Sequence, residues 1–436
     1  MMKKKLFLFY LPLIFSSALF AQTWDGSAST DWNTAANWST NAVPVAAGNV
    51  VIPGSLTNYP IMANNITINS LNMQAGSELD FNGFTLTITN AANYTYFIGA
   101  TLKNSNAGAD IVVNIMGGGG YVAYIRGTTV NDNITFNISG TNAFYDGDVA
   151  GMGNHYVGNA NFNCTSTGGL YICDADTSLY DANLSITRTG AGITQAFNSG
   201  GIIGGNFAFT NNTAGDCQLG NIAIKTSIAG TVNITVNNTT PNLFQLYRLV
   251  NQTGGGIINV QNTRGIDIKN DTLIVTAFSA TGYRSNAYAY LFNSSITGNV
   301  TFADDVTYSG GYSTYIRNNQ ISGTAAFSNN GSNVMYESDV INSGNHYTGS
   351  VSFNCTGTGG LYISDADTSL FDANLTISRT GAGITQAFNS GGVIGGNFAF
   401  TNNTAGNSLF GNLVNKTSIA GTVNITVNNT TPNLFQ

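Results

Sequence analysis

Charged side chains are scarce in this sequence. Asp, Glu, Lys and Arg make up 8% of its 436 residues, against roughly a quarter of an ordinary soluble domain. Without the three lysines at positions 3–5, 21 acidic and 11 basic residues remain, so the net charge is about −10. This acidic balance repels phosphate backbones and anionic lipids, which argues against nucleic acids and membrane surfaces as partners.

Long apolar runs are missing after the first 20 residues. Residues 6–20 are apolar, follow the lysines and precede Ala21. This run is shorter than the roughly 20 residues that span a bilayer, but it has the form of a secretory signal peptide. We therefore predict a signal peptide at residues 1–21, and a mature chain that is secreted or displayed on the bacterial cell surface without a transmembrane segment.

Helical periodicity is missing as well. No segment of the mature chain keeps an apolar period of 3.6 residues over ten positions, and the chain has only six prolines beside 52 glycines. Short segments such as Val232-Asn233-Ile234 instead alternate with the two-residue period of a half-buried strand. With 25 Phe and 20 Tyr the chain can still build a core, so we expect an all-β fold.

A long internal duplication is present. Residues 153–245 recur as residues 344–436, and 76 of these 93 positions are identical. Weaker similarity extends the unit upstream, to residues 119–309 and 310–436, the second copy being shorter. The offset of 191 residues equals eight steps of a shorter period, so the duplication preserves the phase of that period.

The shorter period is a rhythm of 23 to 26 residues between apolar anchors, broken only around residues 260–275. The anchors are Phe136, Phe162, Ile186, Phe209, Ile234, Phe302, Phe327, Phe353, Ile377, Phe400 and Ile425. A fixed period in this range with alternating apolar residues indicates stacked coils. We predict a monomeric, single-stranded right-handed parallel β-helix of about fifteen coils over residues 61–436, behind a cap at residues 22–60. The irregular region is predicted to be one irregular coil or a lateral excursion.

An asparagine recurs three residues before many anchors. The positions are Asn133, Asn159, Asn183, Asn206, Asn299, Asn374 and Asn397. Asn tolerates the left-handed conformation of a tight bend, and its amide can bond the equivalent amide one coil away. We expect a structural asparagine ladder along one corner.

Cysteine and histidine are too few for a metal centre of the zinc type. Cys164 matches Cys355, but serines replace the other two, Cys173 and Cys217, in the second copy. The fold therefore accepts a small side chain there, although a bridge from Cys164 to Cys173 stays an alternative. His155 and His346 are separated by eight coils, about 38 Å, so they cannot share an ion and are expected to be surface residues.

One acidic constellation is duplicated. Asp174, Asp176 and Asp181 recur as Asp365, Asp367 and Asp372. On a strand, residues two apart share a face, so these carboxylates could hold calcium through oxygen ligands. A solvated acidic surface is the alternative, and no other cofactor is expected.

The aromatic residues allow two interpretations. Trp24, Trp32 and Trp38 precede the coils, and we expect them to pack in the cap, with sugar stacking as the alternative ligand role. The pairs Tyr94 with Tyr96 and Tyr288 with Tyr290 each put two rings on one face. Core stacking is favoured for them over an outward platform for sugars.

Four arginines stand out where basic residues are rare. The duplication makes them two pairs of equivalent positions. They are Arg126 with Arg317, and Arg188 with Arg379. They are expected to pair with acidic neighbours across coils or to meet an acidic ligand.

The N-terminal segments carry a resemblance. Trp24-Asp25-Gly26, Asp31-Trp32-Asn33 and residues 49–53 leading into residues 79–88 resemble the openings of β-strand-repeat surface proteins with pectin-lyase-like right-handed β-helices, especially type IX-secreted ones. The resemblance implies architecture and export, not an activity. Such proteins end in a sorting domain, whereas this sequence stops mid-coil at Gln436, so we expect it to be part of a longer chain.

The functional expectation is a structural or adhesion protein without catalytic activity. An enzyme of this fold clusters carboxylates with Arg or Lys on one outward face, and the sequence lacks the Gly-His-Gly and Arg-x-Lys elements of pectin-hydrolysing relatives. An extracellular glycan or a cell-surface component would be its partner. The alternative is a polysaccharide-binding module, or a lyase or hydrolase of the pectin-lyase-like fold.

Overall fold

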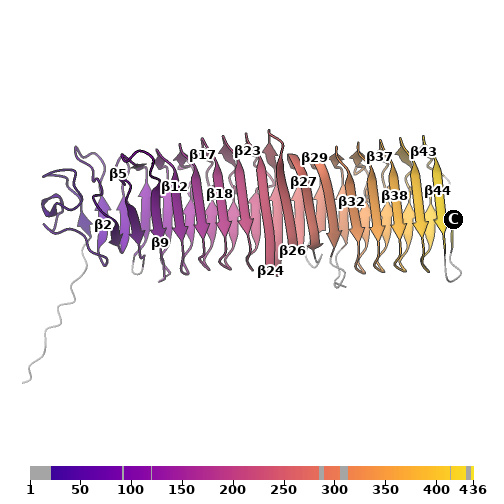
Figure 1. The fold of residues 1–436 in the computed structure, drawn as a ribbon, viewed down its shortest axis with the longest axis horizontal. Coiled ribbons are helices and arrows are strands. Elements are labelled where there is room, and N and C mark those ends of the chain that lie inside the picture. Colours follow the sequence, from indigo (N-terminus) through magenta and orange to yellow (C-terminus); the bar gives the residue numbers. More distant parts are fainter. Residues whose placement is uncertain are drawn as a thin grey trace, which may run out of the picture.

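A computed structural model describes residues 21–90, 93–118, 120–283, 289–304, 313–412, 414–428 and 434–436. The chain forms a right-handed parallel β-solenoid of about 16 turns, and Figure 1 shows the turns stacked into one straight rod. The predicted fold class is confirmed. The predicted signal peptide lies outside the described residues except for Ala21. Within the described part of the chain, no helix is long and apolar enough to cross a membrane.

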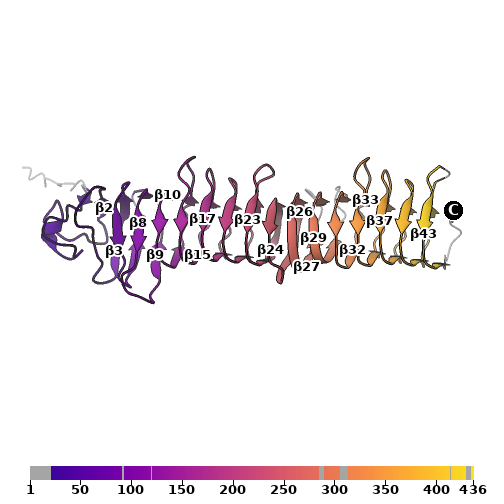
Figure 2. The same cartoon turned by 90° about the horizontal axis from the view of Figure 1, so that it is seen from above.

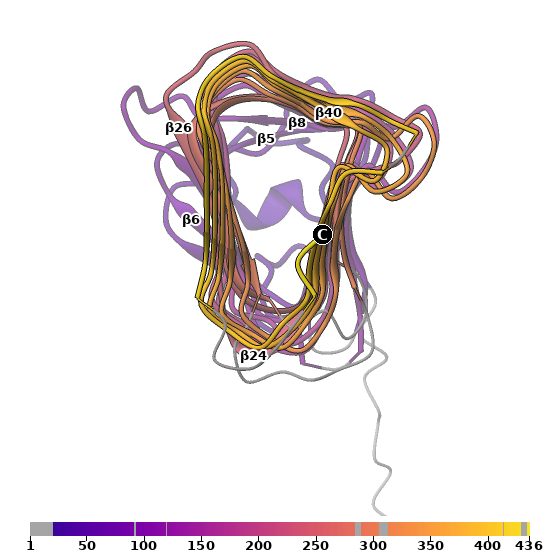
Figure 3. The same ribbon diagram turned by 90° about the vertical axis from the view of Figure 1, so that its right-hand side faces the viewer.

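Each coil has three walls, which the end-on view in Figure 3 shows as a three-sided outline. We name these walls sheet A, sheet B and sheet C. Strands of sheet A carry the predicted anchors and pair in parallel with the coil before and after. They are β3 (Ile66–Ile68), β6 (Thr85–Ile88), β9 (Ile111–Ile115), β12 (Ile134–Ile138), β15 (Ala160–Cys164), β18 (Leu184–Arg188), β21 (Phe207–Asn211), β24 (Val232–Tyr247), β26 (Gly256–Lys269), β27 (Thr272–Tyr283), β29 (Ser295–Asp304), β32 (Ala325–Asn329), β35 (Val351–Cys355), β38 (Leu375–Arg379), β41 (Phe398–Asn402) and β44 (Val423–Val427).

Sheet B follows sheet A along the chain and also contains the C-terminal parts of β24 and β26. Its other strands are β1 (Gln22–Thr23), β2 (Asn49–Ile52), β4 (Ser70–Met73), β7 (Thr95–Ile98), β10 (Ala123–Arg126), β13 (Phe144–Asp146), β16 (Leu170–Ile172), β19 (Thr194–Ala196), β22 (Cys217–Gly220), β28 (Ala289–Phe292), β30 (Thr314–Arg317), β33 (Met335–Glu337), β36 (Leu361–Ile363), β39 (Thr385–Ala387) and β42 (Ser408–Phe410).

Sheet C completes each coil and contains the N-terminal parts of β27 and β29. Its other strands are β5 (Glu78–Asp80), β8 (Thr101–Lys103), β11 (Thr129–Val130), β14 (His155–Tyr156), β17 (Ser178–Tyr180), β20 (Gly201–Ile203), β23 (Thr226–Ile228), β25 (Leu249–Asn251), β31 (Gln320–Ile321), β34 (His346–Tyr347), β37 (Ser369–Phe371), β40 (Gly392–Ile394) and β43 (Thr417–Ile419). Loops project from the corner between sheets B and C, as Figures 2 and 3 show.

The region around residues 260–275 differs from the prediction. It belongs to two successive coils, because Ile234 pairs with Ile258 of β26, and Ile258 pairs with Phe278 of β27. The pairing shifts register within both strands. Such irregularities change the local spacing of apolar residues, which explains why the rhythm is lost in the sequence although the stack continues.

The core lies inside the three walls and is built from the alternate residues of each strand. The anchor rows of sheet A are buried; the rings of Phe136 and Phe162, for example, stack with centroids 5.4 Å apart. Burying successive apolar rows in this way removes each coil's inner face from water, and a single coil could not do so alone.

Truncating one central anchor tests this core. Phe209 is 1% exposed, so replacing it with alanine is expected to lower the free energy of unfolding by about 3–5 kcal/mol, through lost apolar contact and the cavity left behind. Urea unfolding measures the change. Thr210→Ala, the next residue on the outward side of β21, is the control and should cost about 0.5 kcal/mol or less. Equal losses in both variants would contradict the assignment of inward and outward rows.

The predicted asparagine ladder runs along the corner before sheet A. The expected bond between equivalent amides joins Asn183 to the side-chain oxygen of Asn159 at 2.8 Å, but other rungs bond through backbone N–H groups. The side-chain oxygen of Asn133 accepts the backbone N–H of Asn159 at 2.8 Å, and that of Asn206 accepts both the N–H and the hydroxyl of Thr231 at 2.9 and 3.0 Å. Because the backbone N–H is the donor, threonine can occupy the next rung. None of the predicted ladder residues adopts a left-handed conformation.

A second ladder at the corner between sheets B and C has the left-handed conformation that was expected at the first. Asn270, Asn293 and Asn318 have φ angles of 61°, 50° and 52°. Their side-chain amides bond each other in turn, at 2.6 and 2.8 Å. The sequence analysis missed this ladder, although each member lies three residues before a buried apolar residue of sheet C, namely Leu273, Ile296 and Ile321. That constant spacing is the signal that could have found it.

The N-terminal cap is built on the three tryptophans and a short 3-10 helix, η1 (Ala35–Asn37). Trp24, Trp32 and Trp38 are 0–1% exposed and pack edge to face, with centroid distances of 5.0 and 4.8 Å. The indole N–H groups of Trp24 and Trp38 donate to the backbone carbonyls of Asn58 and Trp32, respectively. The rings thus lie in the position expected for cap packing, and a sugar could reach their faces only if the cap opened.

Candidate functional site

One outward row of sheet B carries most of the unusual side chains. We call it the tyrosine track. Its members pair directly from coil to coil and are Tyr96, Tyr124, Tyr145, Tyr171, Gln195, Gln218, Gln245, Asp267, Tyr290, Tyr315, Tyr336 and Tyr362. The first four form the N-terminal ladder, and the last four form the C-terminal ladder.

The tyrosine rings in each ladder stack face to face. Centroid distances are 5.3, 5.4 and 4.4 Å in the N-terminal ladder and 5.2, 5.6 and 5.0 Å in the C-terminal ladder, with interplanar angles of 5–23°. Each side chain is half-buried. Since neighbouring rings cover each other's faces, the ladders present ring edges and hydroxyl groups to the solvent.

Two equivalent glycines leave room for these rings. A Cβ built on Gly169 would lie 2.3 Å from the ring of Tyr171, and one on Gly360 would lie 2.9 Å from the ring of Tyr362. Neither glycine has a left-handed backbone, so space is the constraint. Both copies of the duplication keep this space, which lets the last ring of each ladder lean along its strand.

Arginine forks lie beside both ladders. The guanidinium of Arg126 is 4.3 Å from the ring centroid of Tyr124 and bonds both oxygens of Asp148, at 2.6 and 2.7 Å. Arg317 repeats this arrangement with Tyr315 at 4.4 Å and with Asp339. The predicted pairing of these two arginines with acidic neighbours across coils is confirmed. The hydrogen bond to its aspartate raises the pKa of each arginine, so both stay charged.

Burial affects three of the track's phenols. It raises the pKa of Tyr124 and of Tyr336, and raises the pKa of Tyr145 to about 12. Since a phenol ionises only at about pH 10, at physiological pH the ladders offer uncharged hydroxyls, a group that can donate and accept a hydrogen bond.

The tyrosine pairs singled out in the sequence point outward. Tyr94 is 40% exposed, and Tyr96 is half-buried on the same face of sheet B, so the favoured core placement is wrong for this pair. Tyr290 also faces outward, whereas Tyr288 lies outside the described residues. Whether a side chain points inward or outward depends on which of the two alternating sets of strand residues it belongs to. That assignment needs the strand boundaries, which were not evident among so many small polar residues.

A buried carboxylate lies behind each ladder, and the sequence analysis missed both. Asp146 is fully buried and accepts hydrogen bonds from the hydroxyls of Tyr156 and Tyr180, at 2.9 and 3.0 Å. It also accepts the N–H of Cys173, the hydroxyl of Ser178 and the amide of Asn154. The signal that could have found it is that position 146 stays acidic, as Glu337, in the less similar part of the second copy.

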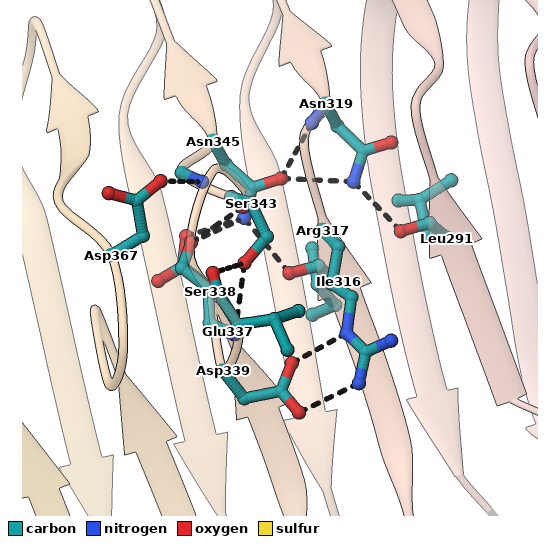
Figure 4. A network of polar contacts seen from close by, with 12 residues as sticks. Leu291, Ile316, Arg317, Asn319, Glu337, Ser338, Asp339, Ser343, Asn345 and Asp367 are labelled. Atoms are coloured by element: carbon teal, nitrogen blue, oxygen red, sulfur yellow. Dashed lines mark hydrogen bonds and ion pairs between the residues drawn. The ribbon is translucent and has the colours of Figure 1, made fainter.

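In the second copy the longer side chain of Glu337 occupies the position of Asp146. Figure 4 shows Glu337 beneath the loop, near the Arg317–Asp339 pair. Its carboxylate accepts the amide of Asn345 at 2.7 Å, the N–H of Ser364 at 2.8 Å and the hydroxyl of Ser369. Each acid thus holds the projecting loop, residues 147–154 or 338–345, to the strands below it.

These buried acids predict a pH dependence of stability. Burial raises the pKa of Asp146 and Glu337, so the folded chain keeps protons at pH values where the unfolded chain has lost them. The free energy of unfolding should then fall as the pH rises from the unfolded value of about 4 through the raised folded values. Urea titrations at several pH values measure this, and Asp146→Asn with Glu337→Gln should flatten the slope. An unchanged slope in that variant, relative to Asp181→Asn, would refute the assignment.

The predicted calcium constellation does not converge on one point. Asp174 and Asp176 lie in a bend, not in a strand, so the two carboxylates do not share a strand face. Asp176 accepts the backbone N–H of Gly153 at 2.7 Å, whereas Asp181 pairs with the imidazole of His155 at 2.8 Å. The copy at Asp365, Asp367 and Asp372 repeats these contacts with Asn389, Gly344 and His346. Across the described ranges, no three His, Cys, Asp or Glu side chains gather as a metal site.

The remaining candidates are internal. All four cysteines are free and buried, so the alternative of a disulfide between Cys164 and Cys173 is wrong. Arg188 and Arg379 are fully buried and bond backbone carbonyls, not carboxylates, so the expectation of an acidic partner is wrong for them. Arg188 bonds the carbonyls of Gly190 and Ser166 at 2.9 and 3.0 Å.

An apolar cavity of about 760 Å³ lies at the last coils and is lined by residues such as Phe398, Phe410 and Val423. A binding site for a small molecule usually combines apolar walls with a few convergent polar groups. The lining has such polar groups, among them Lys416 and Asn415, but its apolar walls are core rows of sheet A, since Val423 pairs with the buried Phe398. We therefore take the tyrosine track, and not this cavity, as the candidate functional site.

Comparison with known proteins gives one partial match. The family model of a domain of unknown function, DUF8693, matches residues 23–138. The matched part comprises the tryptophan cap and the coils through β12, and so includes Tyr96, Tyr124 and Arg126 of the N-terminal ladder. Neither the curated proteins nor the solved structures contain a significant match to the chain.

Proposed function

We propose that this chain is an exported, non-catalytic adhesion or structural protein of the cell surface. The observation that carries the proposal is the repetition of one outward surface on one rigid axis. Eight strand pairings separate Tyr124 from Tyr315, which places equivalent tyrosines of the two ladders, and their arginine forks, about 38 Å apart. Presenting the same surface twice strengthens attachment through avidity, whereas it would not improve an active site.

Several acidic and basic side chains already bond one another or other groups of the chain, which supports a non-catalytic role. General acid and base groups must reach a reacting atom. Here Asp148 is held by Arg126, and Asp181 is held by His155. Asp146 is buried among five hydrogen-bond donors. These groups act as structural pairs that stabilise the coils and their loops.

The tyrosine track also favours a second candidate, a polysaccharide-binding module. Phenol and amide groups along one outward row suit a hydroxyl-rich polymer. A lyase or hydrolase of the pectin-lyase-like kind would need in addition free carboxylates facing the same ligand.

Attachment and turnover should be measured on the same purified chain. Beads coated with it are expected to resist detachment by flow from glycan-coated surfaces. Reducing-sugar and unsaturated-product assays over acidic and neutral polysaccharides should stay at background. Robust turnover would overturn the non-catalytic part, and retention no better than that of albumin-coated beads would overturn the adhesion part.

Export of a reporter fused to residues 1–21 tests the surface location, and retention of the reporter in the cytoplasm would contradict it.

A further inference from the structure

We propose that the tyrosine track binds a linear, neutral, hydroxyl-rich polysaccharide that lies along the solenoid axis and contacts both ladders at once. The inference rests on the proposed adhesion function and names its ligand. It follows from the geometry of the track, from its charge and from the groups that it exposes.

The geometry favours a linear ligand. The track continues without a change of register from Tyr96 to Tyr362. Three glutamines and one buried aspartate fill the four rungs between the ladders, namely Gln195, Gln218, Gln245 and Asp267. Successive rungs are about 4.8 Å apart, so the polar groups form a straight line parallel to the rod. A polymer with a regular repeat can follow such a line, whereas a compact ligand would touch only a few rungs.

The charge favours a neutral ligand. Lys269 lies 2.9 Å from the carboxylate of Asp267, the charged member of the track, and the arginine forks neutralise Asp148 and Asp339. The phenols carry no charge at physiological pH, since a phenol ionises only at about pH 10, and burial raises the pKa of Tyr124, Tyr145 and Tyr336 further. Among the described residues of the track, Lys269 and the two fork arginines are already paired with carboxylates, and the net negative charge of the chain would repel an acidic polymer.

The exposed groups favour recognition by hydrogen bonds. Within the described residues, no hydrogen bond occupies the hydroxyls of Tyr124, Tyr315 or Tyr336, while their ring faces stack on neighbouring rings. A sugar therefore meets hydroxyls and ring edges, not open ring faces. Tyr→Phe substitutions separate the two contributions, because phenylalanine keeps the stack and removes only the hydroxyl.

The test measures the binding of soluble neutral β-glucan oligomers of increasing length to the full chain by calorimetry. Affinity should rise at least 100-fold once an oligomer is long enough to cross the five rungs from Tyr171 to Tyr290, about 24 Å, that separate the ladders. Tyr124→Phe with Tyr145→Phe, or Tyr315→Phe with Tyr336→Phe, should return long oligomers to the affinity of short ones. Thr210→Ala with Thr401→Ala, equivalent outward residues of sheet A, should leave binding unchanged.

Three results would overturn the inference: affinity that does not depend on oligomer length, phenylalanine variants that bind as the wild type does, or tighter binding of polygalacturonate than of the neutral polymer. Unchanged melting temperatures of the variants ensure that lost affinity is not lost folding. If beads still adhere while the glucans do not bind, the ligand assignment fails and the adhesion function stands. Turnover of any polysaccharide would instead remove the proposed function itself.

Discussion

Replacing Asp146 with alanine is expected to lower the free energy of unfolding by about 3–5 kcal/mol, and Glu337→Ala should do the same. The substitution leaves the hydroxyls of Tyr156, Tyr180 and Ser178 without their acceptor inside the stack. Each buried donor left unsatisfied costs about 1–3 kcal/mol. Urea unfolding followed by far-ultraviolet circular dichroism measures the loss.

The exposed pair of His155 with Asp181 supplies the control, since both side chains are more than 40% exposed. Asp181→Ala should cost about 1 kcal/mol or less, as do most surface ion pairs. If Asp146→Ala were no worse than Asp181→Ala, the buried network would not stabilise the coils as we argue.

The duplication supplies a second control for the buried acid. The longer Glu337 occurs together with Phe371, whereas Asp146 occurs with Tyr180, whose hydroxyl reaches the shorter carboxylate. Asp146→Glu alone should overpack the site and cost about 1–3 kcal/mol. Adding Tyr180→Phe should recover part of this loss, and strictly additive losses would show that the two positions are not coupled.

Substitution of Arg188 by methionine is expected to cost about 3–5 kcal/mol. Methionine fills most of the volume, but it leaves the carbonyls of Ser166, Gly168 and Gly190 without donors. A buried ion pair can often be replaced by apolar residues at little cost when both partners change. Both partners cannot be replaced in this case, because the partners of Arg188 are backbone carbonyls.

Arg264 is the matched control, since it is 43% exposed and pairs with Asp216 at 3.3 Å. Arg264→Met should change the free energy of unfolding by about 1 kcal/mol or less. Arg379→Met should match Arg188→Met, because it also leaves backbone carbonyls unpaired in the second copy. A stabilised Arg188→Met variant would show that the free energy of burying the guanidinium exceeds the stabilisation from its hydrogen bonds.

Much of the fold was predictable because a solenoid is nearly one-dimensional. Each coil contacts mainly its neighbours, so the spacing between Phe136, Phe162 and Ile186 translates directly into strand pairing. The prediction lost the rhythm only where the pairing shifts register, in β26 and β27. There the local irregularity changes the spacing without changing the stack.

The candidate site was predictable only in part. Arg126 and Arg317 were recognised as rare cations, and their pairing with acidic neighbours was predicted correctly. The outward orientation of Tyr96 was not predicted, because a shift of one residue in strand assignment turns a side chain from the core to the solvent. Asp174 and Asp176 were placed together on a strand, but a bend separates their carboxylates.

The sequence by itself determined the repeat, its period and the number of coils in the duplication, because these depend on which residues recur and at what distance. Only the tertiary structure decided that the tyrosines of sheet B form one outward row, and that Asp146 and Arg188 lie inside. Those placements depend on strand parity and on contacts between residues more than 20 positions apart, and the spacing of repeats along the chain does not specify either.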